Sequence, residues 1–178
     1  RQCYGTVGID FVAGPSEVLI IADETANATY IAADVLAQCE HDLNARGILI
    51  TTSEKFANEV MKKVEQMLEE LPTKNIAKPS WENNGEVILV DNLKEAVEIS
   101  NQHAPEHLEI STANNDDIID ELINYGSLFI GGYSAEVFGD YVSGTNHTLP
   151  TLKASRYTGG VWVGIFIKTC THQVLNKD

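Results

Sequence analysis

Four short stretches of the sequence bring together side chains that could do chemistry. In the first, Gln38 and His41 are three residues apart at the end of a segment with helical apolar spacing. On a helix their polar tips would project from one face and could converge on one small target. An imidazole and an amide oxygen placed in this way are a weak signal for a zinc site. An ordinary helix C-terminus, whose dipole suits a partly charged imidazole, explains the same residues and is the commoner case.

The second and third stretches place groups that exchange protons or bind hydroxyls next to predicted strands. Glu106 and His107 are adjacent, and Pro105 stiffens the approach to them. A carboxylate and an imidazole that titrates near neutral pH can form an acid–base pair. Ser16 lies in a Gly-Pro-Ser turn before a strand, where its hydroxyl could bind a substrate, although such a sequence is more often only a turn. We expect His103 on the surface.

The fourth stretch, residues 139–147, contains Asp140, a hard oxygen ligand, and His147, a further imidazole. Taken singly, each of the four stretches also fits a solvated loop. The sequence contains no established motif for zinc, for a dinucleotide or for a serine nucleophile. The residues alone therefore indicate a mixed nitrogen and oxygen metal site without a specific reaction.

The elements that must position these side chains alternate along the chain. Strands are predicted at residues 18–22, 48–51, 86–90, 108–111 and 127–130, and helices at residues 29–42, 52–71, 92–101, 116–124 and 134–141. Residues 73–85 are predicted to be a connector with at most one short helical turn. The alternation predicts a doubly wound, mainly parallel α/β sheet with helices on both faces, an incomplete Rossmann-like domain. In such sheets ligands collect outside the carboxyl ends of the strands.

We expect a single domain over residues 1–178. Its first part, residues 1–132, carries the alternating strands and helices, and its second part, residues 133–178, carries an active-site loop and an apolar tail. The tail is apolar at nearly every position between residues 159 and 174. We therefore expect it to be covered, either by the sheet or by a partner chain.

Composition excludes several classes of protein. The hydrophobic share of 43% and the charged share of 21% are those of a globular chain. A net charge of -14 argues against nucleic acid and anionic membranes as partners, and no apolar run approaches the roughly 20 residues that span a bilayer. Cys3, Cys39 and Cys170 form no Cys-x-x-Cys motif, so we expect reduced, buried thiols in a cytosol-like compartment.

Taken in order, the four stretches closely resemble the histidinol dehydrogenase family. The matching motifs are Gly8-Ile9-Asp10 with residues 13–17, then residues 37–41, 104–108 and 139–151, within a similarity that runs from about residue 4 to about residue 174. The resemblance implies oxidation of L-histidinol through L-histidinal to L-histidine in histidine biosynthesis. It also implies two NAD, one zinc ion per active site, a homodimer, and a cytoplasmic location, or a plastid location in a plant.

The resemblance further implies a role for individual residues. The family's zinc ligands are matched by Gln38, His41 and Asp140. Glu106 matches the base that activates the water attacking the aldehyde, and His107 matches the group that exchanges protons with the substrate hydroxyl. The substrate-binding positions are matched by Ser16, Gln38, His41, His107 and Asp140. Zinc would then orient the substrate rather than activate water, and no residue of the chain is matched to NAD.

Three departures from the family pattern limit what this chain is expected to do alone. The N-terminal lobe that supplies most NAD contacts and the C-terminal segment that reaches across the dimer are absent from the sequence. Cys39 stands where alanine is usual, and residues 159–166 are less polar than the family pattern. We therefore expect a fragment that is inactive or nearly so. The alternatives are a non-catalytic domain that binds zinc or an imidazole ligand, and a plain folding unit.

Overall fold

The computed structural model describes residues 2–177, and its central feature is one five-stranded parallel sheet. The strands lie in the order β3-β2-β1-β4-β5 and comprise β1 (Glu17–Ala22), β2 (Arg46–Thr51), β3 (Glu86–Leu89), β4 (His107–Ser111) and β5 (Ser127–Ile130). The chain first adds strands on one side of β1 and then crosses to the other side at β4. This order confirms the predicted doubly wound α/β fold.

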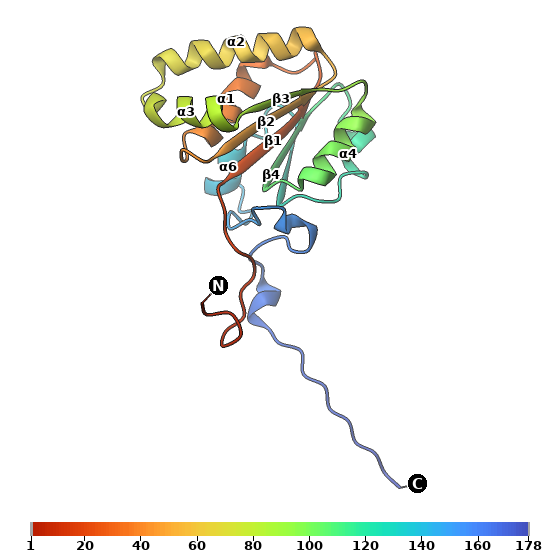
Figure 1. Cartoon of the computed structure of the whole chain (residues 1–178). Helices are drawn as coiled ribbons and strands as arrows, with labels where there is room; N and C mark the ends of the chain where they lie inside the picture. Colours follow the sequence, from red (N-terminus) through yellow and green to blue (C-terminus); the bar gives the residue numbers. More distant parts are fainter. Residues whose placement is uncertain (1, 178) are drawn as a thin grey trace.

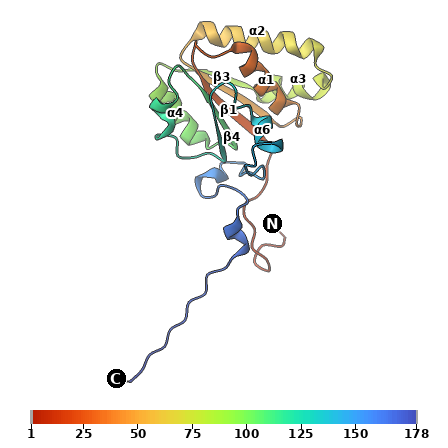
Figure 2. The same ribbon diagram turned by 180° about the vertical axis from the view of Figure 1, so that it is seen from behind.

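Helices cover both faces of this sheet. One face carries α1 (Ala28–Cys39), α2 (Glu54–Glu70), α3 (Lys74–Asn84) and α6 (Glu136–Tyr141), whereas α4 (Leu93–His103) and α5 (Asp116–Ile119) belong to the other. Figures 1 and 2 show α6 beside α1 and α4 across the sheet from both. Among residues 2–177, no helix is long and apolar enough to cross a membrane.

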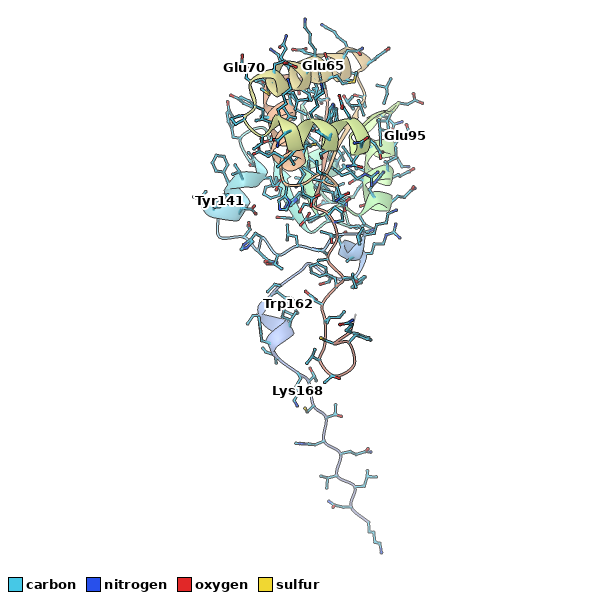
Figure 3. The ribbon with its side chains drawn as sticks, turned by 60° about the vertical axis from the view of Figure 1, so that its left-hand side comes forward. Glu65, Glu70, Glu95, Tyr141, Trp162 and Lys168 are labelled. Atoms are coloured by element: carbon cyan, nitrogen blue, oxygen red, sulfur yellow. The ribbon has the colours of Figure 1, made fainter. Side chains whose placement is uncertain are left out.

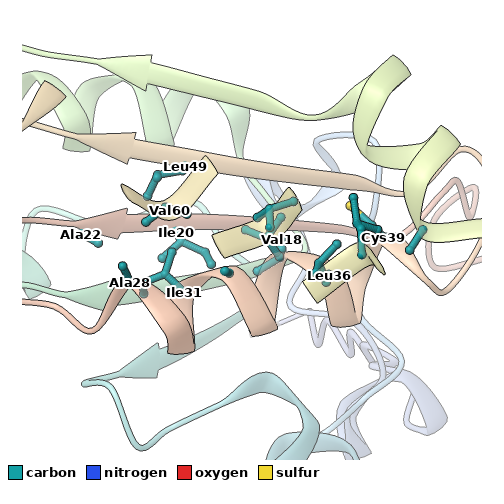
Figure 4. Packing of buried hydrophobic residues seen from close by; sticks show 14 of the residues in the cluster. Val18, Ile20, Ala22, Ala28, Ile31, Leu36, Cys39, Leu49 and Val60 are labelled. Atoms are coloured by element: carbon teal, nitrogen blue, oxygen red, sulfur yellow. The ribbon is translucent and has the colours of Figure 1, made fainter. Parts of the chain in front are cut away.

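Alternation along the strands divides the core into two layers. Val18 and Ile20 pack against α1 and α2, as Figure 4 shows, and Leu19 and Ile21 pack on the opposite face beside α4. All four side chains are fully buried, as expected for a strand covered on both sides. The same alternation decides which side chains of β4 face α1, and it therefore matters for the site.

The prediction of a connector at residues 73–85 is wrong, because α3 occupies residues 74–84. Pro79 lies inside this helix and removes one backbone hydrogen bond. Packing offsets this cost: Ala77 is fully buried, and the Ser80 hydroxyl donates a hydrogen bond of 2.9 Å to the Ala45 carbonyl. Tertiary contacts therefore outweigh the local signal of the proline.

The helix predicted at residues 116–124 is shorter, since α5 ends at Ile119. The Asn101 side chain on α4 accepts hydrogen bonds from the backbone N–H groups of Ile123 and Asn124, at 2.9 and 3.3 Å. Those groups are thus satisfied by α4 rather than by a continuing helix. Leu122 still reaches the core, which explains the apolar spacing that favoured a longer helix.

The segments at the two ends of the chain leave the sheet at the same end (Figure 1). The short 3₁₀ turn η2 (Val163–Phe166) ends at Phe166 and directly follows Trp162, and both of these side chains are exposed. The sheet therefore does not cover the apolar tail, which was one of the two expected alternatives. Figure 3 shows Trp162 well away from the sheet. Cover by a partner chain stays a prediction. Cys39 is buried as expected, but Cys3 and Cys170 lie in these end segments and are exposed, which corrects the expectation for both.

Candidate functional site

The candidate residues gather at the amino edge of the sheet. Ser16 directly precedes β1 and His107 opens β4, and the two strands pair in parallel with Val18 opposite His107. Helix α1 runs back along β1 and ends at Cys39, so the helix predicted over residues 29–42 is shorter. Gln38, in its last turn, and His41, in the turn that follows it, return to the same edge. The expectation of a site at the carboxyl edge is therefore wrong. In a right-handed β-α-β unit, residues that end a helix or precede a strand lie at the amino edge.

The loop before β4 turns sharply to present Glu106. Ala104 ends α4 in the left-handed region with a φ of 50°, and it directs the chain back toward the sheet. The Glu106 carboxylate oxygen Oε2 then accepts a hydrogen bond of 3.0 Å from the backbone N–H of Glu17, and the Ser16 hydroxyl also bonds to this carboxyl. A turn after α4 and the start of β1 thus fix one carboxylate.

Burial makes Glu106 a base at neutral pH. Its side chain is buried, and this desolvation raises the pKa of the carboxyl to about 7, helped by the charges of Glu17 and Asp140 and opposed by the two hydrogen bonds. A carboxyl with a pKa near the working pH can both take and return a proton. This is the property that a general base in hydrolytic or hydration chemistry needs.

His107 lies beside Glu106 with a defined tautomer. Its Nδ1 is 3.1 Å from the backbone carbonyl oxygen of Glu17, which can only accept, so Nδ1 carries the proton in the neutral ring. Nδ1 is also 3.6 Å from Oε2 of Glu106, and Nε2 is 3.4 Å from Oε1 of Glu136. Burial lowers the pKa of the imidazole, which leaves Nε2 free to accept a proton at neutral pH.

The three predicted metal ligands belong to this corner of the domain. Gln38 is 2% exposed, and its carbonyl oxygen Oε1 is buried without a hydrogen-bond partner among the described residues. His41 and Asp140 are exposed, and both lie close enough to His107 to act on its charge. Within residues 2–177, His, Cys, Asp and Glu side chains form no group of three able to hold a metal. One imidazole, one carboxylate and an unpaired amide oxygen still fit the donor types that zinc accepts.

Two contributors to this corner were not expected from the sequence. Glu17 contributes its backbone N–H to Glu106 and its carbonyl to His107, so one peptide segment aligns both. Glu136, on α6, contacts Nε2 of His107 and lies four residues before Asp140 on the same helix face. The i, i+4 spacing of these two acidic residues could have indicated from the sequence that they share one helix face.

The other two histidines stay outside the corner. His103 is half-buried rather than on the surface, and burial lowers the pKa of its imidazole. His147 is exposed in the loop after α6. Neither forms a hydrogen bond to a candidate residue among the contacts of the described chain.

The carboxyl edge, where a dinucleotide would be expected in this fold, is closed by an acidic turn. The Asp23 carboxylate follows β1 and accepts hydrogen bonds from the backbone N–H groups of Ala113 and Thr25, at 2.8 and 2.9 Å. The hollow beside it is lined by Glu24 and Glu59 and also by Lys55 and Ser53 at the start of α2. Charges of both signs therefore line this edge.

Comparison with known proteins relates the whole chain to one family. The sequence model described as histidinol dehydrogenase matches residues 1–178. The chain is 51% identical to a histidinol dehydrogenase homolog of Shouchella clausii, covering 97% of this chain and 41% of that protein. It is 48% identical to the histidinol dehydrogenase of Methanocaldococcus jannaschii, covering 100% and 41%.

A solved structure agrees with these sequence matches. The crystal structure of histidinol dehydrogenase from Elizabethkingia anophelis superposes with a TM-score of 0.85 at 44% identity, covering 90% of this chain and 36% of that one. The chain thus spans about two fifths of the length of the relatives it matches.

Proposed function

The chain belongs to the histidinol dehydrogenase family, and on that premise we propose that it carries the acid–base, substrate and zinc residues of an enzyme that oxidises L-histidinol through L-histidinal to L-histidine. The observation that carries the proposal is the pairing of Glu106 and His107. Nδ1 of His107 is 3.6 Å from Oε2 of Glu106, and the backbone of Glu17 holds both side chains. The amino-edge corner is therefore the proposed active site.

His107 takes the proton of the substrate alcohol in this proposal. Because Nδ1 is committed to the Glu17 carbonyl, Nε2 is the nitrogen that accepts the proton from the hydroxyl. The lowered pKa of the ring keeps it neutral, and so able to accept, at pH 7. NAD, when bound, accepts the hydride from the carbon that carries the hydroxyl.

Glu106 would act as the base in the second oxidation, in which the aldehyde histidinal reacts with water. With a pKa of about 7, its carboxylate can take a proton from the water that attacks histidinal. The N–H of Glu17 and the hydroxyl of Ser16 fix the carboxylate and so limit the directions from which a water can approach. The oxygen of the water would bond to the aldehyde carbon as one water proton passes to Glu106, which leaves the conjugate base of the hydrate as the species for the second oxidation.

Substrate and metal would meet at Gln38, His41 and Asp140. Among residues 2–177 the buried carbonyl oxygen of Gln38 has no hydrogen-bond partner, and this supports the assignment, since a buried acceptor without a partner costs stability unless a ligand satisfies it. Zinc, when bound, would supply a positive charge that orients the amino and imidazole groups of histidinol. We assign no residue of this chain to NAD. A homodimer and a cytoplasmic location belong to the same proposal and rest on family membership alone.

The test compares two substitutions in the protein at its native length. We expect Glu106→Gln to slow oxidation of histidinal by about 10²-fold to 10⁴-fold while interconversion of histidinol and histidinal persists. His107→Asn should slow both stages. His103→Asn, a matched change outside the corner, should leave both rates within about twofold.

Equal loss of both stages in Glu106→Gln would contradict the role given to its carboxyl. Assayed alone, the 178-residue chain should form little or no NADH with histidinol, because it spans only about two fifths of the length of the relatives that it matches. If the 178-residue chain binds zinc or histidinol but shows no turnover, the alternative that it acts alone as a non-catalytic binding domain would be favoured.

A further inference from the structure

A well-buried segment crosses the amino edge of the sheet between the loop after α6 and the apolar tail. It comprises residues 149–156, which we call the strap, and includes the 3₁₀ turn η1 (Ala154–Arg156), drawn in blue below the sheet in Figure 1. Five of its eight residues are buried, so it is packed against the domain and is not a loose connection. Two of the buried residues carry hydroxyls, Thr151 at 4% exposed and Ser155 at 8%.

Ser155 binds the turn that presents Glu106. Its hydroxyl donates a hydrogen bond of 2.7 Å to the carbonyl oxygen of Ala104, a fully buried residue. This carbonyl belongs to the planar peptide group that joins Ala104 to Pro105, so the bond fixes the direction in which the chain continues to Glu106. The carbonyl oxygens of Pro105 and Glu106 accept the N–H of Gly126 at 3.0 and 3.1 Å. The three successive carbonyls of this turn are thus all held by distant parts of the chain.

Thr151 binds the segment that contacts the carboxylate of Glu106 from the other side. Its hydroxyl oxygen accepts the N–H of Gly14 at 2.6 Å. Gly14 is two residues before Ser16, whose hydroxyl bonds to Glu106, and three residues before Glu17, whose N–H donates to the same carboxylate at 3.0 Å. The strap therefore contacts the chain two residues before Ser16 and two residues before Glu106.

Left-handed backbone is concentrated where the strap meets this turn. Among residues 2–177, three non-glycine residues have a positive φ, namely Ala104 at 50°, Leu152 at 53° and Lys153 at 66°. The last two lie between the two hydroxyl residues of the strap, and the first lies in the turn that Ser155 binds. Such backbone is disfavoured for residues with a side chain, and for Ala104 also because a proline follows it. Surrounding contacts must maintain these conformations, which gather at functional sites.

The position of Glu106 depends on these contacts more than that of its neighbour does. His107 is the first residue of β4 and pairs with Val18 of β1 and Ser127 of β5, so the sheet fixes its backbone. Glu106 lies one residue outside the strand, and its carboxylate is placed by the turns on either side of it. Loss of a strap contact should therefore displace Glu106 before it displaces His107.

We propose that Thr151 and Ser155 are positioning residues that hold the Glu106 carboxylate in place for the attack of water on the aldehyde. The inference rests on the proposed function, since that function gives Glu106 a water to deprotonate. Thr151 acts through the turn that contains Ser16, and Ser155 acts through the peptide group before Pro105. Both hydroxyls bond to backbone groups, so they act on Glu106 through the chain and not by direct contact.

The first test follows the position of Glu106 without catalysis. The N–H of Glu17 donates to the carboxyl of Glu106, so its NMR shift should change when that carboxyl ionises in the ¹⁵N-labelled 178-residue chain. We expect Ser155→Ala and Thr151→Val to reduce this change by half or more. Ser155→Thr and Thr151→Ser keep a hydroxyl and should retain most of it. A full response in both Ser155→Ala and Thr151→Val would overturn the proposal.

Ser80→Ala is the matched control for the loss of a buried serine hydroxyl. The Ser80 hydroxyl donates a hydrogen bond of 2.9 Å to the carbonyl of Ala45, so it ties α3 to the residue before β2. This variant should also lose stability but should leave the response of the Glu17 amide unaltered. An equal reduction in Ser80→Ala would show that Ser155 acts through stability in general, and it would reject the positioning role.

The second test compares the two oxidations in the protein at its native length. Ser155→Ala should lower kcat for histidinal oxidation by about tenfold or more with KM within about twofold, because substrate still binds when the base is misplaced. Interconversion of histidinol and histidinal should stay within about twofold, and Ser155→Thr should restore most of the lost rate.

The outcomes separate the positioning role from the proposed function. Wild-type kcat for histidinal in Ser155→Ala, or an equal loss of both oxidations, would reject the positioning role alone. If the wild-type protein does not oxidise histidinol, the proposed function fails, whereas the response of the Glu17 amide would still show whether the strap places Glu106.

Discussion

Glu106→Gln should stabilise the chain at neutral and alkaline pH while it removes the proposed base. Burial raises the pKa of this carboxyl from its ordinary 4.5 to about 7, so the folded chain holds a proton that the unfolded chain releases in that window. The free energy of unfolding of the wild type therefore falls as pH rises from about 4.5 to about 7. Over 2.5 pH units at about 1.4 kcal/mol each, the charged carboxylate costs about 3 kcal/mol.

Glutamine keeps an oxygen that accepts the N–H of Glu17 but never ionises. We expect Glu106→Gln to match the wild type at pH 4.5 and to exceed it by up to about 3 kcal/mol at pH 8. Urea unfolding followed by fluorescence measures this difference, since Trp81 packs partly buried against the core. Glu98→Gln, on the exposed side of α4, is the control and should show no such dependence on pH. A difference that stays constant between pH 4.5 and 8 would refute the claim that this carboxyl is desolvated.

Three further outcomes follow from the same corner. Oxidation of histidinal by the protein at its native length should rise with pH to half its maximum near pH 7, the pKa of Glu106, and a flat profile from pH 5 to 9 would contradict that role. Thr151→Val should cost about 1–2 kcal/mol, since the Thr151 hydroxyl accepts the Gly14 N–H at 2.6 Å, and Thr151→Ser should retain most of the stability in the same urea assay. Gly14→Ala should cost about 1–3 kcal/mol, because a Cβ there would lie 2.4 Å from Cγ of Leu152, and the added change Leu152→Ala should recover most of the loss.

The sheet could be predicted from sequence because its signals are local. The apolar run from Val18 to Ala22 is buried on both faces and nothing in the fold opposes it. Helix α3 could not be predicted in this way, since Pro79 argues against a helix and only the contacts of Ala77 and Ser80 with the body of the domain outweigh it. Local propensity fails where distant residues decide the outcome.

The candidate site residues could be named from the sequence but not placed in space. The resemblance to a family named Glu106 and His107, and the structure brings them within 3.6 Å of one another. Their location at the amino edge was missed, because we relied on the general rule that ligands bind at the carboxyl ends of the strands in open α/β sheets. Glu106 directly precedes β4 and His107 is its first residue, and both positions lie at the amino edge. Glu136 was missed because the i, i+4 spacing to Asp140 places it on one helix face but does not reveal that α6 brings it within 3.4 Å of Nε2 of His107.

Binding of zinc and histidinol at the amino-edge corner is tested most directly by following the backbone amide signals of the ¹⁵N-labelled chain while zinc and then L-histidinol are added to saturation. We expect shifts at Ser16, Gln38 and His107, with the turn at Asp23 and Thr25 unchanged. Shifts confined to that carboxyl-edge turn, or no shifts at any concentration, would contradict it.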